Sequence, residues 1–394
     1  MNQNDKTYLN RALEPKIHEL ARGYPVLVLT GPRQSGKTTL ARKIFHDRPY
    51  VSLEDLDERS FAEDDPRGFL RRFPEGAIID EVQRVPTLLS YLQGVVDREQ
   101  KSGQFILTGS SQLPLAEVTS QSLAGRAAII QLLPFSLLEL KDRDAGVHVT
   151  LERQLLNGSY PRVHMTDVSP ADWYSDYIKT YIERDVRLIK AVHDLHLFQK
   201  FVKMCAGRCG QILNLESLGT DCGISQSTAR SWMSILETTF ICFRLQPHFE
   251  NFSKRLIKAP KLYFYDSGIL CSLLGIHRAE EIVAHSMRGH IFESFIISEF
   301  YKSFVNQHRT PPLYYWRDSK GIEVDLIVET SQALIPIEIK SGETFNRDFI
   351  KTLATYLSYA KPRAKNPGVV FGGTGNFVRE EVHVVGWGEA TALI

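Results

Sequence analysis

Residues 31–38 combine the groups that bind a polyphosphate. They read Gly-Pro-Arg-Gln-Ser-Gly-Lys-Thr, so two glycines, a lysine and a threonine stand at the spacing Gly-x-x-x-x-Gly-Lys-Thr. Glycine lets backbone N–H groups close around phosphate oxygens, the lysine reaches the β- and γ-phosphates, and the threonine hydroxyl can ligate Mg²⁺. The pattern therefore predicts a site for a nucleoside triphosphate, by default ATP, and Mg²⁺. The residues predicted to contact the nucleotide are Gly31, Arg33, Ser35, Gly36, Lys37, Thr38 and Thr39, with Lys37 also catalytic and Thr38 also a metal ligand.

The segments on either side of this loop have the hydrophobic patterns that a phosphate-binding loop requires. Residues 26–29 are all Val or Leu, which predicts a buried parallel strand. After the loop, Leu40, Ala41, Ile44 and Phe45 fall on one helical face. A helix that begins at the loop adds positive potential at the phosphates. A chance glycine turn is the alternative interpretation.

Two carboxylates end a second apolar segment. Residues 76–81 read Gly-Ala-Ile-Ile-Asp-Glu, which predicts a strand that ends at the two acids. Asp80, at the carboxyl end of this strand, is predicted to hold Mg²⁺ through water, and Glu81 is predicted to polarise the attacking water. The alternative is a strand followed by an ordinary Asp-Glu turn.

Two more polar positions follow along the chain. Residues 104–111 form an apolar strand that ends in small polar residues, and ligands of a doubly wound sheet lie beyond the carboxyl ends of the strands. Ser110 is therefore predicted to sense the γ-phosphate or to position water. Arg126, which precedes an apolar segment at 127–132, is predicted to supply charge to a γ-phosphate in its own subunit or in a neighbour. A strand-end turn and a solvated loop are the respective alternatives.

The composition is that of an ordinary globular protein with one basic region. The chain has 394 residues, enough for two or three domains, with 43% hydrophobic and 24% charged residues and a formal net charge of +1. Residues 196–262 hold nine Lys or Arg against four Asp or Glu, whereas 50–65 is acidic. The basic region is either a surface that meets a polyanion or a solvated basic face.

The cysteines and the hydrophobic segments favour a cytoplasmic protein. There are five cysteines and no Cys-x-x-Cys pair, so we expect small buried thiols rather than a metal site. The most apolar stretch, 127–140, is broken by Gln131, Pro134 and Ser136, and the N-terminus has no apolar signal core. We therefore expect a cytoplasmic location and no membrane partner.

The middle of the chain has the pattern of a winged helix. Residues 172–208 are predicted to be helical, and 213–237 has helix-turn-helix form, with Gly223 in the turn and Ser225 as N-cap of the second helix. A strand-like segment and a basic run to Lys261 follow, as expected for a β wing. The module is predicted to contact DNA, or alternatively to serve as a protein-interaction module or an ATPase lid. The predicted groove-facing residues are Gln226, Ser227, Thr228 and Arg230, and the predicted phosphate contacts are Lys254, Arg255, Lys258 and Lys261.

A third set of acids and a lysine lies in the C-terminal part. Glu293 stands near the start of an amphipathic helix, Asp325 lies in a strand at 321–328, and Glu338 and Lys340 share one face of the next strand. Asp325 and Glu338 on adjacent strands can hold a second divalent metal beside a phosphodiester, and Lys340 can position or deprotonate water. All four residues are predicted to be catalytic. A helix at 347–359 and a strand at 368–371 follow.

The motifs together resemble the AAA-type ATPases of bacteria and archaea that carry a C-terminal uncharacterised module. The resemblance covers nearly the whole chain, and it implies a P-loop ATPase that uses ATP and Mg²⁺ and that often assembles into rings. The segments that carry it are 31–40, 79–83, 107–111, 123–126, 158–162, 181–186, 254–258 and 261–268.

The ordered C-terminal set also resembles the PD-(D/E)xK nuclease fold. Relatives of that fold include restriction enzymes and Holliday-junction resolvases. The resemblance implies either metal-dependent cleavage of DNA, with branched DNA as one substrate class, or a fold that is retained for binding DNA or for assembly.

These observations predict an α/β chain of three domains: an AAA-type P-loop ATPase with a parallel sheet at 1–165, a helical linker and winged helix at 166–275, and a PD-(D/E)xK nuclease-like α/β domain at 276–394. The predicted function is a DNA-associated homo-oligomeric ATPase that engages, moves or processes DNA. One alternative is an ATP-gated assembly switch whose C-terminal domain binds DNA or protein without cutting. Another is an ATPase that acts on a protein client alone.

Overall fold

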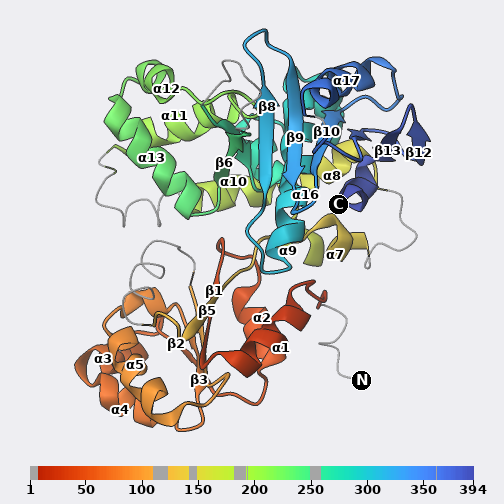
Figure 1. Ribbon diagram of the computed structural model, residues 1–394. Helices are drawn as coiled ribbons and strands as arrows, with labels where there is room; N and C mark the ends of the chain where they lie inside the picture. The colour runs from red at the N-terminus through yellow and green to blue at the C-terminus, as the bar shows by residue number, and fades with distance from the viewer. Residues whose placement is uncertain are drawn as a thin grey trace. The chain divides into compact units, whose positions relative to one another are not determined.

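The computed structural model describes residues 8–109, 123–141, 149–181, 192, 194–248, 259–360 and 362–394 (Figure 1). Its contacts divide the chain into two compact units. The first unit consists of residues 1–143 with two short pieces, 238–240 and 304–309, and the second contains the remainder. Each unit has its own sheet and core.

The first unit is built on a five-stranded, entirely parallel sheet. The strand order is β2-β3-β4-β1-β5, so the strand that leads into the phosphate loop lies between β4 and β5. Every residue of β1, β3 and β4 is buried, because helices cover both faces of the sheet. The strands are β1 (Val26–Thr30), β2 (Tyr50–Ser52), β3 (Ala77–Asp80), β4 (Phe105–Thr108) and β5 (Ala127–Gln131).

Alternate residues of the central strands enter two separate cores. In β1, Val26 and Val28 pack with residues of α3, α4 and α5, whereas Leu27 and Leu29 pack with residues of α1 and α2 (Figure 1). This alternation is the normal consequence of strand geometry, and here both faces are apolar. The helices of this unit are α1 (Glu14–Gly23), α2 (Lys37–Ile44), α3 (Leu56–Asp64), α4 (Pro66–Arg71), α5 (Leu88–Glu99) and α7 (Leu137–Lys141), with a 3₁₀ turn at Val82–Arg84.

The second unit combines helices with an eight-stranded mixed sheet of order β12-β13-β11-β10-β9-β8-β6-β7. Strand β10 runs antiparallel to β9 and parallel to β11, and α17 (Asp348–Ala360) makes the crossover between the two parallel strands (Figure 1). The strands are β6 (Cys242–Pro247), β7 (Lys261–Phe264), β8 (Leu313–Arg317), β9 (Glu323–Glu329), β10 (Leu334–Lys340), β11 (Gly368–Phe371), β12 (Asn376–Arg379) and β13 (Val382–Gly386).

Helices α8 to α13 of the second unit precede this sheet in the chain, and α14 to α16 lie between β7 and β8. Two of them, α12 and α13, form the expected helix-turn-helix: Gly223 has φ +78° in the turn, and Ser225 Oγ accepts the Thr228 backbone N–H at 3.1 Å. The helices are α8 (Leu151–Asn157), α9 (Pro161–Met165), α10 (Pro170–Tyr181), α11 (Leu195–Ala206), α12 (Leu215–Cys222), α13 (Gln226–Thr238), α14 (Ser267–Leu273), α15 (Ala279–Ala284) and α16 (Arg288–Val305), with a 3₁₀ segment at Trp387–Leu393.

The expected wing strands belong to the C-terminal sheet. Strands β6 and β7 pair antiparallel, as in a wing, but β6 also pairs with β8, so the two strands continue the sheet of the following segment. The structure therefore differs from the predicted boundaries: it places the division near residue 143 instead of 165, and it does not separate 166–275 from 276–394.

Two expectations about the rest of the chain can be compared directly. All five cysteines are buried and free, which confirms the prediction of small buried thiols. Within the described ranges, none of the helices has the length and hydropathy that a bilayer span requires.

Close packing of α14 on α10 depends on Gly268. A Cβ added to Gly268 would lie 2.1 Å from Cε2 of Tyr174, a fully buried ring. We therefore expect Gly268→Ala to lower the free energy of unfolding of the second unit by about 1–3 kcal/mol, measured by urea denaturation. Gly289, in α16, is the matched control because a Cβ there meets no atom within 4 Å. Gly289→Ala should be neutral or stabilise by up to ~1 kcal/mol, and equal effects of the two changes would contradict this packing.

Candidate functional site

The phosphate loop adopts a backbone that only glycine accommodates at two positions. Gly31 has φ +147°, and a Cβ there would lie 2.1 Å from the carbonyl oxygen of Leu132. Gly36 has φ +95° and is the N-cap of α2, without a side-chain cap among the described residues. The first turn of α2 therefore keeps backbone N–H groups directed toward the loop, where they can bind an anion.

Two side chains of the loop are placed to meet a phosphate. Lys37 is buried, and its Nζ donates to the carbonyl oxygens of Gly31 at 3.0 Å and Pro32 at 2.7 Å. The Ser35 hydroxyl is fully buried and has no hydrogen-bond partner among the described residues. A buried hydroxyl without a hydrogen bond is costly, so the unpaired Ser35 hydroxyl and the glycine backbone together fit a loop that binds a ligand. Arg33 is half-buried and Thr39 is exposed on α2.

Asp80 is the centre of a hydroxyl cluster at the carboxyl edge of the sheet. Thr38 Oγ1 donates to its carboxylate at 3.1 Å, the Tyr50 hydroxyl donates at 2.8 Å, and the Thr108 hydroxyl also donates. Burial, followed by the hydrogen bond to Asp80, raises the pKa of Tyr50 to about 12, so the phenol remains a donor. A threonine hydroxyl and a carboxylate in contact are the oxygen ligands that Mg²⁺ prefers, so the residues present fit this metal.

Sequence reasoning missed two members of this cluster. Thr108 lies at the end of β4, within the run from which Ser110 was chosen, and its position at a strand end was the available signal. Tyr50 begins β2 and carried no such signal. Ser110 itself lies outside the described residues.

Glu81, one residue beyond Asp80, has φ +56° and accepts a hydrogen bond from the Gln83 amide. A glutamate with left-handed backbone angles is strained, and such strain is characteristic of functional positions.

A buried ion pair holds the loop from the side of the N-terminal segment. Arg11 and Glu139 are 5% and 4% exposed, and Arg11 Nε lies 3.0 Å from Glu139 Oε1. The same guanidinium donates to the carbonyl oxygens of Ser35 at 2.9 Å and Leu133 at 2.6 Å. One planar side chain thus connects the phosphate loop to the segment after β5, and no motif in the sequence indicated it.

Arg126 lies at the opposite end of the sheet from the phosphate loop. Its carbonyl oxygen accepts the N–H of Val26, the first residue of β1, whereas the loop follows the last residue, Thr30. Its guanidinium pairs with Asp97 of α5. The five-residue strand separates the two positions by about 15 Å. The structure therefore does not bring Arg126 to the loop of its own chain, and a role in a neighbouring subunit stays a prediction.

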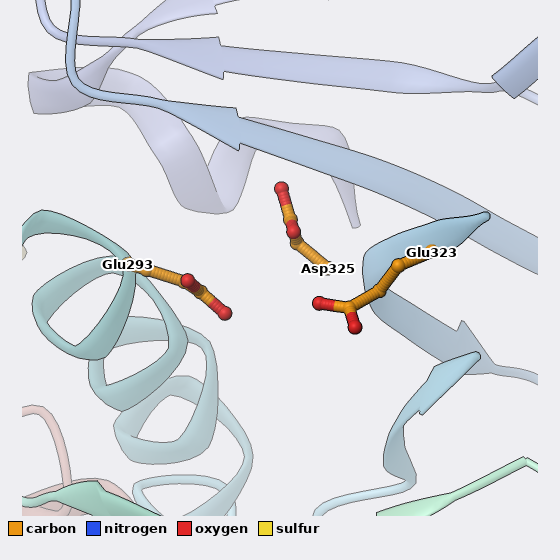
Figure 2. Close-up of side chains that lie close together, drawn as sticks. All are labelled: Glu293, Glu323 and Asp325. Atoms are coloured by element: carbon orange, nitrogen blue, oxygen red, sulfur yellow. The ribbon is translucent and has the colours of Figure 1, made fainter. Parts of the chain in front are cut away.

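The second unit brings together the C-terminal acids. Glu293 on α16 and two acids of β9, Glu323 and Asp325, offer carboxylate oxygens within 4.8 Å of one another, and Figure 2 shows Glu293 on its helix facing the two strand residues. On β10, Lys340 Nζ lies 3.0 Å from Asp325 and 2.5 Å from Glu338. The structure therefore brings the four predicted residues together: Glu293 lies near Asp325, and Lys340 contacts both Asp325 and Glu338.

Two neighbours of these acids were not predicted in this role. Glu323 lies two residues before Asp325 and thus on the same strand face, a signal that the alternation of β9 already contained. Lys261 was expected to contact DNA phosphates, but that expectation is wrong because its side chain is only 3% exposed in β7. Its Nζ lies 3.2 Å from Glu293 and also contacts Glu323.

The surroundings shift the pKa values of Glu293, Glu338 and Lys340. Burial alone would raise the pKa of Glu293, but Lys261, with hydrogen bonds from His290 and Tyr263, outweighs it and lowers the value to about 2. Burial and the charge of Asp325 raise the pKa of Glu338 well above its usual range. The Lys340 pKa is raised, because Asp325 and Glu338 outweigh its burial. A site in which one carboxyl has a lowered pKa and another has a raised pKa is typical of functional centres.

The helix-turn-helix presents a polar face to solvent. Gln226, Ser227 and Arg230 are exposed and Thr228 is half-buried, while the opposite side of α13 packs through Ala229, Trp232, Met233, Ile235 and Leu236. The predicted phosphate contacts Lys254, Arg255 and Lys258 lie outside the described residues.

Three protein families match successive parts of the chain. Residues 23–141 match the AAA domain, residues 149–280 match a domain of unknown function (DUF8612), and residues 288–389 match another domain of unknown function (DUF4143). The AAA match includes all five strands of the first unit.

Individual proteins are similar over most of the chain. Uncharacterised proteins Rv2008c of Mycobacterium tuberculosis and Mb2031c of Mycobacterium bovis are each 31% identical over 325 residues, which is 81% of this chain and 71% of the relative. Among solved structures, the Walker-type ATPase PABY2304 of Pyrococcus abyssi is 14% identical with a TM-score of 0.45, over 66% of this chain and 94% of that chain.

The Arg11–Glu139 pair should position the loop as well as stabilise the unit. Arg11→Met leaves a buried carboxylate without its cation, so we expect a loss of about 3–5 kcal/mol in the free energy of unfolding and weaker binding of an ATP analogue by calorimetry. Arg11→Met/Glu139→Leu removes both charges and should recover stability but not affinity. The exposed Arg22 of α1 is the control: Arg22→Met should change neither. Wild-type affinity in Arg11→Met would contradict the positioning role.

The depressed pKa of Glu293 predicts acid sensitivity of the second unit. Its folded value is about 2 and its ordinary value is 4.5, so its contribution to stability is present above pH 4.5 and is lost as the pH falls toward 2. Glu338 stays protonated in this window because its pKa is raised. Glu293→Gln should therefore flatten the dependence of unfolding free energy on pH by up to ~1.4 kcal/mol per pH unit, measured by urea denaturation from pH 6 to 2. Equal slopes in both proteins would contradict this assignment.

Proposed function

We propose a function for this chain from one premise: it belongs to the same family as the two uncharacterised mycobacterial proteins, and its residues 23–141 match the AAA domain. Its first unit is accordingly of the AAA-type P-loop ATPase class, whose members use nucleotide and typically Mg²⁺. In this proposal, ATP hydrolysis in the first unit drives the engagement, movement or processing of DNA by the second unit.

The observation that carries the ATPase assignment is the meeting of the loop with Asp80. Thr38 and Asp80 would hold Mg²⁺, which supplies charge neutralisation at the β- and γ-phosphates when bound. Lys37 would exchange its backbone carbonyl contacts for phosphate oxygens, and the buried Ser35 hydroxyl would gain an acceptor. Glu81, fixed by its left-handed backbone beside Asp80, would orient the attacking water. Thr108 would hold the Asp80 carboxylate in place.

The second unit supports a role in handling DNA. Its core order of helix α16, strands β8, β9 and β10, helix α17 and strand β11 is the order expected of a PD-(D/E)xK nuclease-like domain. Asp325 and Glu338 would hold a divalent metal beside a phosphodiester, Glu293 would complete the acidic set, and Lys340 would position the water. The exposed first turn of α13 would face a DNA groove, with the basic segment 254–258 on phosphates.

A second candidate function has its own supporting observation. Lys261 and Lys340 already neutralise the carboxylates of the second unit, an arrangement that suits a DNA- or protein-binding fold which does not cut. In that case ATP binding would gate assembly or partner recruitment. A homo-oligomer, in which Arg126 approaches a neighbour's nucleotide, is compatible with both candidates.

Steady-state ATP turnover, with and without linear and four-way DNA, tests the first part of this proposal. We expect Mg²⁺-dependent hydrolysis that DNA stimulates, and a loss of about 10²-fold or more in Lys37→Ala, because the loop loses its charge at the transferred phosphate. Lys43→Ala, on an exposed position of the same helix, is the control and should hydrolyse ATP normally. Turnover that DNA never affects would favour a protein client.

The same DNA substrates distinguish cleavage of DNA from binding without cleavage. Incubation with Mg²⁺ or Mn²⁺ should yield cleavage by the wild type and none by Asp325→Asn, whereas both should retain DNA in a gel-shift assay. Binding without cleavage in every metal and substrate would remove the nuclease assignment and leave the ATP-gated switch.

A further inference from the structure

A buried lysine stands where a cluster of acids would otherwise take a metal ion. The carboxylates of Glu293, Glu323 and Asp325 approach closely enough to hold one cation. The ammonium of Lys261 already contacts two of them, and the charge of Asp325 acts on it as well. Its ring neighbour Tyr315 lies 5.5 Å away, which adds a cation–π contact. The Lys261 ammonium is therefore the cation that these carboxylates contact in the structure.

Three cations already lie beside these three acids. Lys261 pairs with Glu293 and Glu323, Arg317 lies 3.3 Å from Glu323, and Lys340 lies 3.0 Å from Asp325 and is shared with Glu338. A divalent ion that entered this group would add positive charge beside these cations, and it would have to displace an ammonium that is 3% exposed.

The backbone of Lys261 is fixed on both sides. Lys261 pairs with Leu245 of β6 and forms a bridge with Ile212, while Gly210 N–H donates to the carbonyl oxygen of Leu262 at 2.7 Å. Since β7 is hydrogen-bonded on both sides, the residue that places the ammonium beside the acids belongs to the sheet and not to a loop.

One ligand position of the wider site remains open. Glu338 Oε2 lies 2.5 Å from Lys340, but its Oε1 is buried and has no partner among the described residues. Because a buried carboxylate oxygen without a partner is costly, this atom points to a ligand that binds on the Asp325–Glu338 side, away from Lys261.

We propose that Lys261 is the resident cation of the Glu293, Glu323 and Asp325 group and keeps a divalent ion out of it, so that the second unit takes up at most one such ion, at Asp325 and Glu338. This rests on the proposed DNA-handling function of the second unit. Two-metal chemistry places ions about 3.5–4 Å apart to hold the attacking and leaving oxygens of a phosphodiester. Here Lys261 provides fixed positive charge in place of the second ion, but it provides no metal-bound water.

Counting Mn²⁺ on the nucleotide-free full chain tests this proposal. Electron paramagnetic resonance of free Mn²⁺ gives the number of ions bound, and the difference between proteins cancels any ion held by the first unit. Lys261→Met should bind one more Mn²⁺ than the wild type. The additional ion should be lost when Glu323→Gln is combined with Lys261→Met, because the group then lacks an acid.

Thermal stability gives a second readout that does not depend on catalysis. Lys261→Met leaves buried acids without a cation, so its melting temperature should fall by roughly 10 °C and recover when Mn²⁺ is added. Lys261→Gln, which keeps a polar side chain, serves if the methionine variant does not fold. Lys302→Met is the matched control, since Lys302 is an equally buried lysine that lies 2.8 Å from Glu299. It should be destabilised without any recovery in Mn²⁺.

The outcomes distinguish this inference from the function on which it rests. An equal ion count in wild type and both Lys261 variants would overturn the role of Lys261. No ion in the wild type and one in Lys261→Met would uphold that role and remove metal-dependent cleavage from the proposed function.

Discussion

The constraint on which both units depend is that a charge withdrawn from water must meet an opposite charge. Moving an ion into a protein interior costs several kcal/mol even after relaxation, so an unpaired buried charge is not tolerated. In the first unit this constraint fixes Arg11 between Glu139 and the phosphate loop. In the second unit it gathers Lys261 with the acids of α16 and β9. Each pairing joins segments far apart in sequence and thereby positions a site.

Parallel strands supply the second part of the arrangement. Because the carboxyl ends of β1, β3 and β4 lie at one edge of the sheet, residues from separate parts of the chain converge there. Asp80 receives hydrogen bonds from Thr38, which follows β1, and from Thr108, which ends β4. The apolar character of these strands secures the sheet, while the polar residues just past their ends form the site. The AAA-domain match over residues 23–141 includes all of these residues.

The sequence predicted the residues whose role depends on their neighbours along the chain. It missed the residues whose role depends on where the fold buries them. The loop and Asp80 were found because strand, glycine turn and helix are adjacent along the chain. Thr108 was passed over because only the folded sheet shows its contact with Asp80. Lys261 was placed on a surface because a basic run precedes it, yet its β7 position is interior. Composition also does not show the pairing of β6 with β8, which joins the predicted wing strands to the C-terminal sheet. Arg126 shows that a charged residue before a strand occupies the edge opposite the ligands.

The function proposed for this chain requires a nucleotide site formed by the loop and Asp80. The most direct measurement is a calorimetric titration of the purified chain with a non-hydrolysable ATP analogue, with Mg²⁺ and then with the metal chelated. We predict one analogue bound per chain in Mg²⁺, and binding that weakens about tenfold or more without the metal, since Thr38 and Asp80 then have no cation to share with the phosphates. Absence of binding at millimolar analogue, or binding that the metal does not alter, would contradict the central claim.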